Sequence, residues 1–217
     1  MADSALQRKN MVESQVRPSD VTDRRITAAM QQIARERFVP QGSETLAYMD
    51  EALAVGQNRA MMAPRTFARL LQLASVESTD TVLDVGCLTG YSAAIVSGMA
   101  KSVVALESDT QMAAAARRNL ADLKVGNVEV VSGELAAGYA AKAPYEVILL
   151  EGAIDDVPEA LLAQLAQNGR LVAIETKGRL GSAIVVTKSA LAASKRTAFE
   201  ASAPRLPGFA QPAGFVF

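Results

Sequence analysis

The stretch Val82-Leu83-Asp84-Val85-Gly86-Cys87-Leu88-Thr89-Gly90-Tyr91 decides the fold. It begins as an apolar run that carries one acid, passes through a turn flanked by two glycines, and leads into a helical pattern from Tyr91. A unit of this kind places free backbone N–H groups at the carboxyl end of a strand, where open α/β sheets bind their ligands. We therefore expect a ligand over residues 86–90.

Beyond residue 80 the chain alternates short β-branched runs with helical patterns. Nearly unbroken apolar strands separated by helices are typical of a parallel sheet that is covered on both faces. The sequence therefore predicts an α/β fold with a doubly wound, mostly parallel, Rossmann-like sheet. The expected strands are residues 81–85, 102–107, 128–132, 145–150 and 170–174, with an antiparallel strand at 182–187; the expected helices are 91–99, 109–123 and 158–167.

Residues 1–63 follow a different pattern, and we expect them to form an N-terminal helical extension with a substrate-side loop, ahead of a ligand-binding domain at 64–217. Apolar residues recur at helical spacing across 20–38, which predicts one amphipathic helix. Residues 41–63 show no sustained period and are expected to form a loop, and Pro64 then suits the first turn of another helix. The secondary structure of residues 133–142 is ambiguous. The alanine runs at 113–116 and 190–193 are expected to be helix-packing residues.

Composition narrows the classes of function. The 22 basic and 23 acidic residues nearly cancel, so we expect neither a nucleic acid nor a membrane as partner. The start of the chain lacks the apolar region of a secretory signal, and the single cysteine fits a reducing, cytoplasmic location. The chain has no histidine, which excludes imidazole acid–base catalysis and histidine-ligated zinc, and we expect no metal.

Two carboxylates favour a nucleoside ligand. Asp84 lies just before the first glycine of the turn, and Glu107 ends the second expected strand, where its carboxylate can accept hydrogen bonds from both ribose hydroxyls. The glycine spacing differs from the G-x-G-x-x-G of dinucleotide sites, which disfavours a nicotinamide-dependent dehydrogenase. The pattern therefore favours an adenosyl group without a pyrophosphate. The alternative for Glu107 is an acid in a solvated loop. Cys87 is expected to be a packing residue rather than a nucleophile.

These residues resemble the protein-L-isoaspartate O-methyltransferase family. The resemblance extends over residues 11–15, 21–23, 35–40, 47–56, 82–91 and 169–172, and generic methyltransferases lack its N-terminal part. It implies S-adenosyl-L-methionine as methyl donor and, as acceptor, the free α-carboxylate of an isoaspartyl residue in a protein or peptide. A carboxylate with a pKa of about 4 is already ionised at neutral pH, so the missing histidine is no obstacle. The resemblance places Asp84, Gly86, Cys87, Leu88, Gly90, Glu107 and Glu134 at the cofactor.

The chain departs from the family's pattern at the loop before Pro64. Ala60, Met61 and Met62 stand where the family has Thr-Ile-Ser, so two hydroxyls are lost. Either the methionines pack in the core, or the pocket takes a less polar acceptor. Arg59 could replace the hydroxyls by binding an acceptor carboxylate through two hydrogen bonds. We expect Arg59 to face solvent, however, and an isoaspartyl peptide to be methylated weakly or not at all.

Three further departures concern the cofactor side. Leu88 replaces a glycine, which leaves two alternatives: its side chain crowds the ligand, or the backbone angle that a glycine permits is unavailable. Glu134 replaces an aspartate that the family positions for the adenine amino group. Glu151 follows the fourth expected strand, and contact with an acceptor and exposure to solvent are equally expected. Two functions stay open: a methyltransferase acting on a carboxylate or an unknown small acceptor, and a catalytically inactive member that serves as a binding or regulatory module.

Overall fold

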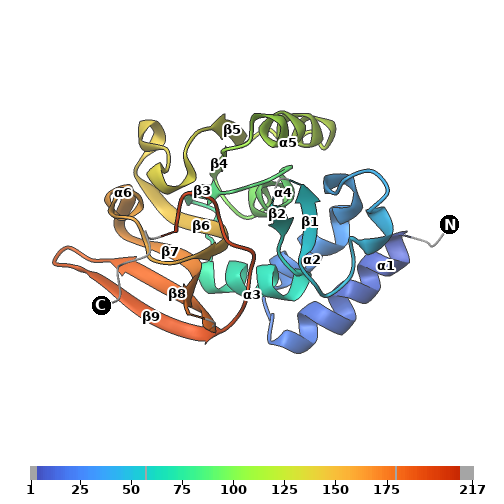
Figure 1. Cartoon of the computed structure of the whole chain (residues 1–217), viewed down its shortest axis with the longest axis horizontal. Coiled ribbons are helices and arrows are strands. Elements are labelled where there is room, and N and C mark those ends of the chain that lie inside the picture. Colours follow the sequence, from blue (N-terminus) through green and yellow to red (C-terminus); the bar gives the residue numbers. More distant parts are fainter. Residues whose placement is uncertain (1–3, 57, 179, 211–217) are drawn as a thin grey trace, which may run out of the picture.

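The computed structural model describes residues 4–56, 58–178 and 180–210. The central strands are β3 (Thr81–Val85), β4 (Ser102–Glu107), β5 (Val128–Ser132), β6 (Tyr145–Ile154), β7 (Leu165–Lys177), β8 (Leu180–Lys188) and β9 (Ala193–Glu200). They form one sheet in the order β5-β4-β3-β6-β7-β8-β9 (Figure 1). The pairs from β5 to β7 are parallel, while β8 and β9 each run antiparallel to the preceding strand. The predicted doubly wound, mostly parallel sheet is confirmed.

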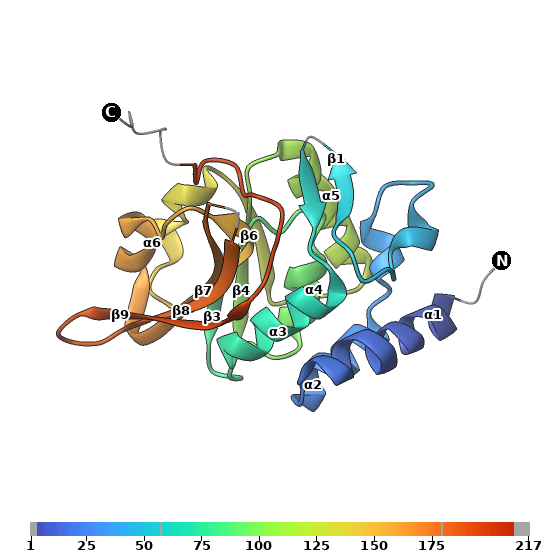
Figure 2. The ribbon, with the colours of Figure 1, turned by 60° about the horizontal axis from the view of Figure 1, so that its bottom comes forward.

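Helices cover both faces of this sheet, because successive residues of a strand point to opposite sides. Val82 belongs to one core, together with residues of α3 (Pro64–Ala74), α4 (Tyr91–Ser97) and α5 (Thr110–Asp122). Leu83 belongs to a second core with Leu161 of α6 (Glu159–Ala163). Figure 2 shows α3 and α4 along one side of the sheet, away from α6. The segment 133–142 forms two 3-10 turns, Leu135–Ala137 and Ala140–Lys142.

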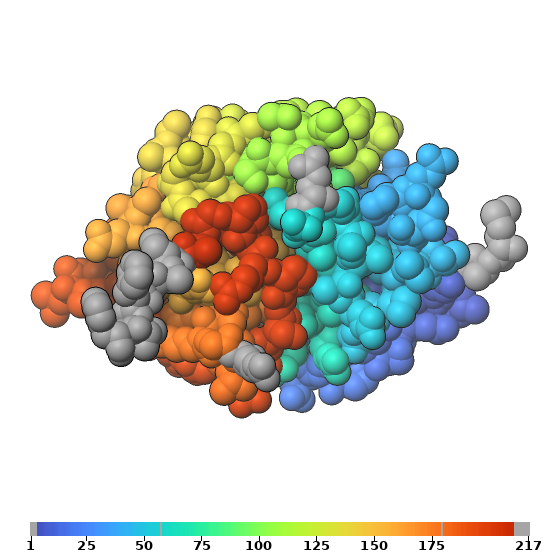
Figure 3. Space-filling view, in the orientation of Figure 1, coloured from blue at the N-terminus to red at the C-terminus, as the bar shows by residue number. Residues whose placement is uncertain are grey.

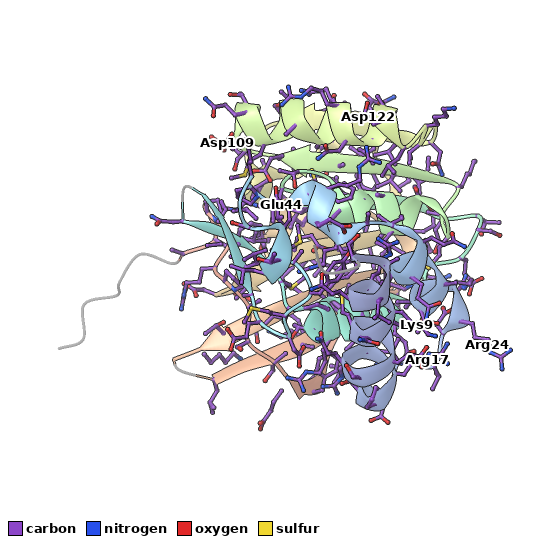
Figure 4. All side chains as sticks on the ribbon, turned by 90° about the vertical axis from the view of Figure 1, so that its right-hand side faces the viewer. Lys9, Arg17, Arg24, Glu44, Asp109 and Asp122 are labelled. Carbon is purple, nitrogen blue, oxygen red and sulfur yellow. The ribbon has the colours of Figure 1, made fainter. Side chains whose placement is uncertain are left out.

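The N-terminal segment adds a helical layer to the first of these cores. It consists of α1 (Ser4–Met11), a π-helical turn (Val12–Val16), a 3-10 turn (Arg17–Ser19) and α2 (Arg24–Gln32). The Asp23 carboxylate accepts a hydrogen bond from the Arg25 N–H and so caps α2. Met11 and Ile26 are buried in the core shared with α3 and α4. Charged side chains such as Lys9, Arg17 and Arg24 lie on the outer side of this layer (Figure 4).

The prediction of one helix over residues 20–38 is wrong. The helix α2 ends at Gln32, because Ile33 and Ala34 adopt extended backbone angles, and a separate 3-10 turn spans Arg35–Phe38. This break brings Arg35 into the core, where 1% of it is exposed. There its Nε donates to the Ala47 carbonyl at 2.8 Å and its Nη2 donates to the Met62 carbonyl at 2.6 Å.

Residues 41–63 also differ from the predicted loop. They contain a 3-10 turn at Glu44–Leu46 and an antiparallel hairpin of β1 (Leu53–Gly56) and β2 (Arg59–Met61). Gly56 and Asn58 take φ angles of 112° and 57°, which suit a tight turn between paired strands. Strands of three or four residues are too short for an alternating pattern to stand out in the sequence.

The C-terminal part is mostly strand. The predicted strand at 182–187 is confirmed as part of β8, whereas the prediction that 190–193 is a helix-packing run is wrong, because these residues turn into β9. The helix α6 stops at Ala163, short of the predicted 167, because β7 begins at Leu165. Residues 211–217 of the predicted aromatic tail lie outside the described part. No helix in the described ranges is long and apolar enough to cross a membrane.

After β9 the chain returns across the end of the sheet. Ala153 donates its N–H to the Pro204 carbonyl, and Leu206 donates its N–H to the Ala153 carbonyl, both at 2.8 Å. Figure 3 shows this returning segment, in red, on the surface beside the β1–β2 hairpin, in cyan. The hairpin and the returning segment therefore flank the place where β3 and β4 end.

Candidate functional site

The loop after β3 docks on the neighbouring strand β4. The N–H groups of Gly86 and Cys87 both donate to the Leu106 carbonyl, at 2.8 and 3.2 Å. Gly86 and Gly90 have φ angles of 85° and 97°, which glycine adopts readily. A Cβ atom on Gly90 would lie 3.2 Å from the Cβ atom of Ala116 in α5. The second glycine thus lets α4 start close to α5.

Glu107 is the centre of the site. It ends β4 and is fully buried, so it is not a solvated loop acid. Its Oε1 accepts hydrogen bonds from the backbone N–H groups of Ser108 and Asp109, at 2.8 and 3.1 Å, and its Oε2 accepts one from the Leu88 N–H at 2.8 Å. Figure 4 labels Asp109 and Asp122 at the opposite ends of α5, and the Asp109 end is the one at the site.

Arg59 lies inside this site, and the expectation that it faces solvent is wrong. Its side chain is 6% exposed and forms an ion pair with Glu107 through two hydrogen bonds. Nη1 donates to Oε1 at 2.6 Å and Nη2 donates to Oε2 at 3.1 Å. A Cβ atom added to Gly86 would lie 3.2 Å from the Arg59 Nη2 and 2.8 Å from the Leu206 Cδ2. Arg59 and Leu206 therefore cover the glycine over which a ligand is expected.

Leu88 is accommodated in a conformation that glycine would adopt more easily. Its φ angle is 54°, in the left-handed region that costs an ordinary residue about 1 to 2 kcal/mol. The hydrogen bond from its N–H to Glu107 holds this backbone in place. Its side chain is 5% exposed and packs in the core. The left-handed angle is therefore available to Leu88, and crowding of the ligand by its side chain stays a prediction.

A small cavity lies under the loop, with a volume of about 10 Å³. This is room for about one water molecule. Arg35, Met61, Met62, Phe67, Tyr91 and Glu151 are among the residues that line it. Within the described ranges, four buried polar atoms at or near the cavity have no hydrogen-bond partner: Arg35 Nη1, Asp84 Oδ1, Tyr91 Oη and Glu151 Oε1.

Burial governs the ionisation of the two acids near this cavity. Burial raises the pKa of Asp84, and the hydrogen bond from the Ser92 Oγ to its Oδ2, at 2.7 Å, opposes that rise. Burial raises the pKa of Glu151 too; the nearby Asp84 charge adds to this rise and the Arg35 charge opposes it. Glu151 is 8% exposed, so of the two expectations for it, exposure to solvent is wrong.

The remaining predicted site residues have different places. Met61 and Met62 are buried in the core, which agrees with the packing alternative. Ala60 lies between Arg59 and Met61 in β2. Cys87 is buried, and burial raises the pKa of its thiol, which fits a packing residue. Glu134 is exposed, and its backbone carbonyl accepts a hydrogen bond from the Ala137 N–H at 3.2 Å, so its place at the adenine stays a prediction.

The sequence reasoning missed Arg35 and Leu206 as residues of the site. The Arg35 guanidinium lies 4.8 Å from the centre of the Tyr91 ring, a distance at which a cation is attracted to the ring. Glu36 and Arg37 beside it are charged as well, so the sequence carries no signal that singles out Arg35. Leu206 gives no such signal either, because only the return of the chain after β9 brings it to Gly86.

A larger hollow of about 470 Å³ lies elsewhere, where β6 and β7 end. Two ion pairs lie in it: Lys195 donates to Glu175 at 2.6 Å, and Arg205 pairs with Asp155. It contains neither the glycine loop nor Glu107. We therefore place the candidate site beside Glu107, at the end of β4.

The parallel sheet, the glycine loop after its first strand and the buried acid at the end of the next strand define the class of protein, a methyltransferase-type α/β domain. The family described as protein-L-isoaspartate(D-aspartate) O-methyltransferase matches residues 6–198. This chain belongs to that family. Two relatives named protein-L-isoaspartate O-methyltransferase illustrate the match: that of Methanoculleus marisnigri is 38% identical over 167 residues (77% of this chain, 76% of the relative), and that of Koribacter versatilis is 37% identical over 186 residues (86% and 84%).

Solved structures agree on the fold. A structure named protein-L-isoaspartate O-methyltransferase aligns with a TM-score of 0.82 at 24% identity, over 93% of this chain and 66% of that chain. A putative protein-L-isoaspartate O-methyltransferase from Plasmodium falciparum, solved in complex with S-adenosyl-L-homocysteine, aligns with a TM-score of 0.77 at 19% identity, over 91% and 98%. The family match does not favour the alternative of an inactive binding module.

Proposed function

We propose that this protein is an S-adenosylmethionine-dependent O-methyltransferase that methylates a carboxylate, with isoaspartyl residues of proteins or peptides as its class of acceptor. The observation that carries this proposal is Glu107, a buried carboxylate at the end of β4 beside the glycine loop, in a chain that its family matches over residues 6–198. Carboxylates at this position of α/β folds accept hydrogen bonds from ribose hydroxyls.

The side chains of the site match the hydrogen-bonding groups of an adenosyl ligand, but the cavity is too small to hold one. Glu107 supplies a carboxylate for the ribose, and the unpartnered Asp84 Oδ1 is a buried acceptor for a positively charged amino group. The cavity of about 10 Å³, however, compares with about 300 Å³ or more for typical ligand pockets. The Arg59 and Leu206 side chains cover Gly86. In this proposal the ligand binds once Arg59 has left Glu107.

When bound, S-adenosylmethionine supplies an electrophilic methyl group. An acceptor carboxylate with an ordinary pKa of about 4 is ionised at neutral pH, so it would need no general base. One of its oxygens would form the new bond to the methyl carbon while the methyl–sulfur bond breaks, and S-adenosylhomocysteine would be the leaving group. Met61, Met62 and Phe67 line the cavity and keep water out, which strengthens the interactions that orient the reacting groups. Residues 1–63 would then supply the acceptor side, and residues 64–217 would hold the donor.

The test is transfer of a labelled methyl group to two matched peptides, one isoaspartyl and one with normal aspartate. We expect transfer to the isoaspartyl peptide only, loss of transfer in Glu107→Gln, and retention in Glu129→Gln. Glu129 is a suitable control because it is half exposed and pairs with Lys142, away from the site. If wild type neither binds S-adenosylhomocysteine in a calorimetric titration nor transfers the label, the proposed function is wrong.

A further inference from the structure

The Arg59 guanidinium offers Glu107 two hydrogen-bond donors, as the two hydroxyls of a ribose would. Its two terminal nitrogens donate to the two carboxylate oxygens, at 2.6 and 3.1 Å. A guanidinium is a rigid, planar fork with donors spaced to match a carboxylate. Two neighbouring ribose hydroxyls also offer two donors to one carboxylate. The same pair of oxygens cannot accept both sets of donors at once.

We propose that the Arg59 guanidinium occupies the position at Glu107 that the ribose hydroxyls would take. An adenosyl ligand then binds only by displacing this guanidinium from Glu107. Arg59 thereby sets the affinity of the donor site. The inference rests on the proposed function, which assigns the ribose to Glu107, and it adds a residue of β2 that competes with the ligand.

Glu107 remains well satisfied when Arg59 leaves. Its carboxylate keeps three backbone donors, from Leu88, Ser108 and Asp109, and the incoming ribose replaces the lost pair. Arg59 itself makes one further polar contact in the site, from Nη2 to the Gly86 carbonyl at 3.3 Å. The exchange therefore swaps one set of donors for another without leaving the buried carboxylate uncompensated.

The consequence is a measurable reduction of affinity. When only a fraction of the molecules has a free binding position, the apparent dissociation constant equals the intrinsic constant divided by that fraction. Each tenfold excess of the Arg59-occupied state thus weakens apparent binding about tenfold. Removing the guanidinium should reveal the intrinsic affinity of the site.

The decisive experiment is calorimetric titration of S-adenosylhomocysteine into wild type, Arg59→Gln and Arg59→Lys. We expect Arg59→Gln to bind about tenfold tighter or more than wild type. We expect Arg59→Lys to lie between the two, because an ammonium retains the charge but cannot bind both oxygens through a fork. Arg65→Gln is the matched control: Arg65 is half exposed, pairs with Asp50, and loses the same charge outside the site.

Four other outcomes would overturn this inference. Equal or weaker binding by a folded Arg59→Gln protein would overturn the inference and leave the proposed function standing. Tighter binding by Leu206→Ala but not by Arg59→Gln would also overturn it, because Leu206 also covers Gly86. If Arg59→Gln does not fold, Arg59→Lys decides: unchanged affinity overturns the inference. Absence of binding in every variant would refute the proposed function itself, and the inference with it.

Discussion

Arg59 and Glu107 form a buried ion pair with two hydrogen bonds, between residues 48 positions apart in the sequence. The pair joins the β1–β2 hairpin to the end of β4, and Glu107 simultaneously holds the Leu88 N–H and the two backbone N–H groups that lead into α5. One carboxylate thus fixes three segments at the edge of the sheet where the ligand is expected. The two partners are unequal, because Glu107 has other donors and Arg59 has few other acceptors.

This inequality predicts different stability losses for the two partners. Glu107→Ala leaves the Arg59 guanidinium buried without a counter-charge, and such a change costs about 3 to 5 kcal/mol. Arg59→Gln leaves a carboxylate that still accepts three backbone hydrogen bonds, so we expect a loss of about 1 to 2 kcal/mol. Urea denaturation of the two variants measures the difference. Equal losses would show that the backbone donors do not stabilise the unpaired Glu107 carboxylate.

A second prediction concerns Leu88→Gly. The variant relieves the left-handed backbone, worth about 1 kcal/mol, but exposes cavity surface and gives the unfolded chain more freedom. We expect a small net change in the free energy of unfolding and tighter binding of S-adenosylhomocysteine, because the removed side chain opens space beside the glycine loop. Calorimetry on the folded variant tests this. Unchanged or weaker affinity would mean that the Leu88 side chain does not obstruct the ligand.

A third prediction follows from the raised pKa of Glu151. In the unfolded chain this carboxyl ionises near pH 4, whereas in the folded protein burial keeps it protonated to higher pH. Between these two pKa values the folded state binds more protons than the unfolded state. The free energy of unfolding therefore falls as pH rises, by about 1.4 kcal/mol per pH unit for one such group.

Glu151→Gln removes this contribution, since a glutamine does not titrate. Urea denaturation at about pH 5 and about pH 7 should show a smaller loss of stability in the variant than in wild type. Asp84 also has a raised pKa and remains in the variant, so part of the pH dependence should persist. Identical pH dependence in both proteins would mean that Glu151 is ionised in the folded state.

The elements that could be predicted from the sequence are those whose own residues show a periodic or glycine pattern. The strands around residues 81–85 and 102–107, and the glycines of the loop between them, follow from local periodicity and backbone requirements. The hairpin at 53–61 and the position of Arg59 do not, because a three-residue strand has no period and the direction of an arginine depends on its tertiary partner. Leu206 shows the same limit: its contact with Gly86 depends on the path of a segment about 120 residues away in the chain.

The last prediction concerns the acceptor. Once the donor has displaced Arg59 from Glu107, the Arg59 guanidinium is a free cation beside residues 60–62. The side chains of Ala60, Met61 and Met62 offer no hydroxyl to a carboxylate. We expect the freed guanidinium to bind the acceptor carboxylate, and turnover of an isoaspartyl peptide to be slow because this one anchor replaces two hydroxyls. A hydrogen bond to a charged group contributes about 1.5 to 3 kcal/mol, so at saturating donor Arg59→Gln should raise the acceptor KM about tenfold or more.

The same variant should therefore have opposite effects on the two ligands, with tighter binding of the donor product and weaker use of the acceptor. Steady-state kinetics with a labelled methyl donor, at several concentrations of an isoaspartyl peptide, gives the acceptor KM, and Arg65→Gln again controls for the lost charge. An unchanged acceptor KM in Arg59→Gln would show that the displaced guanidinium turns to solvent. Rapid turnover by wild type combined with that result would mean that backbone groups of the hairpin hold the acceptor instead.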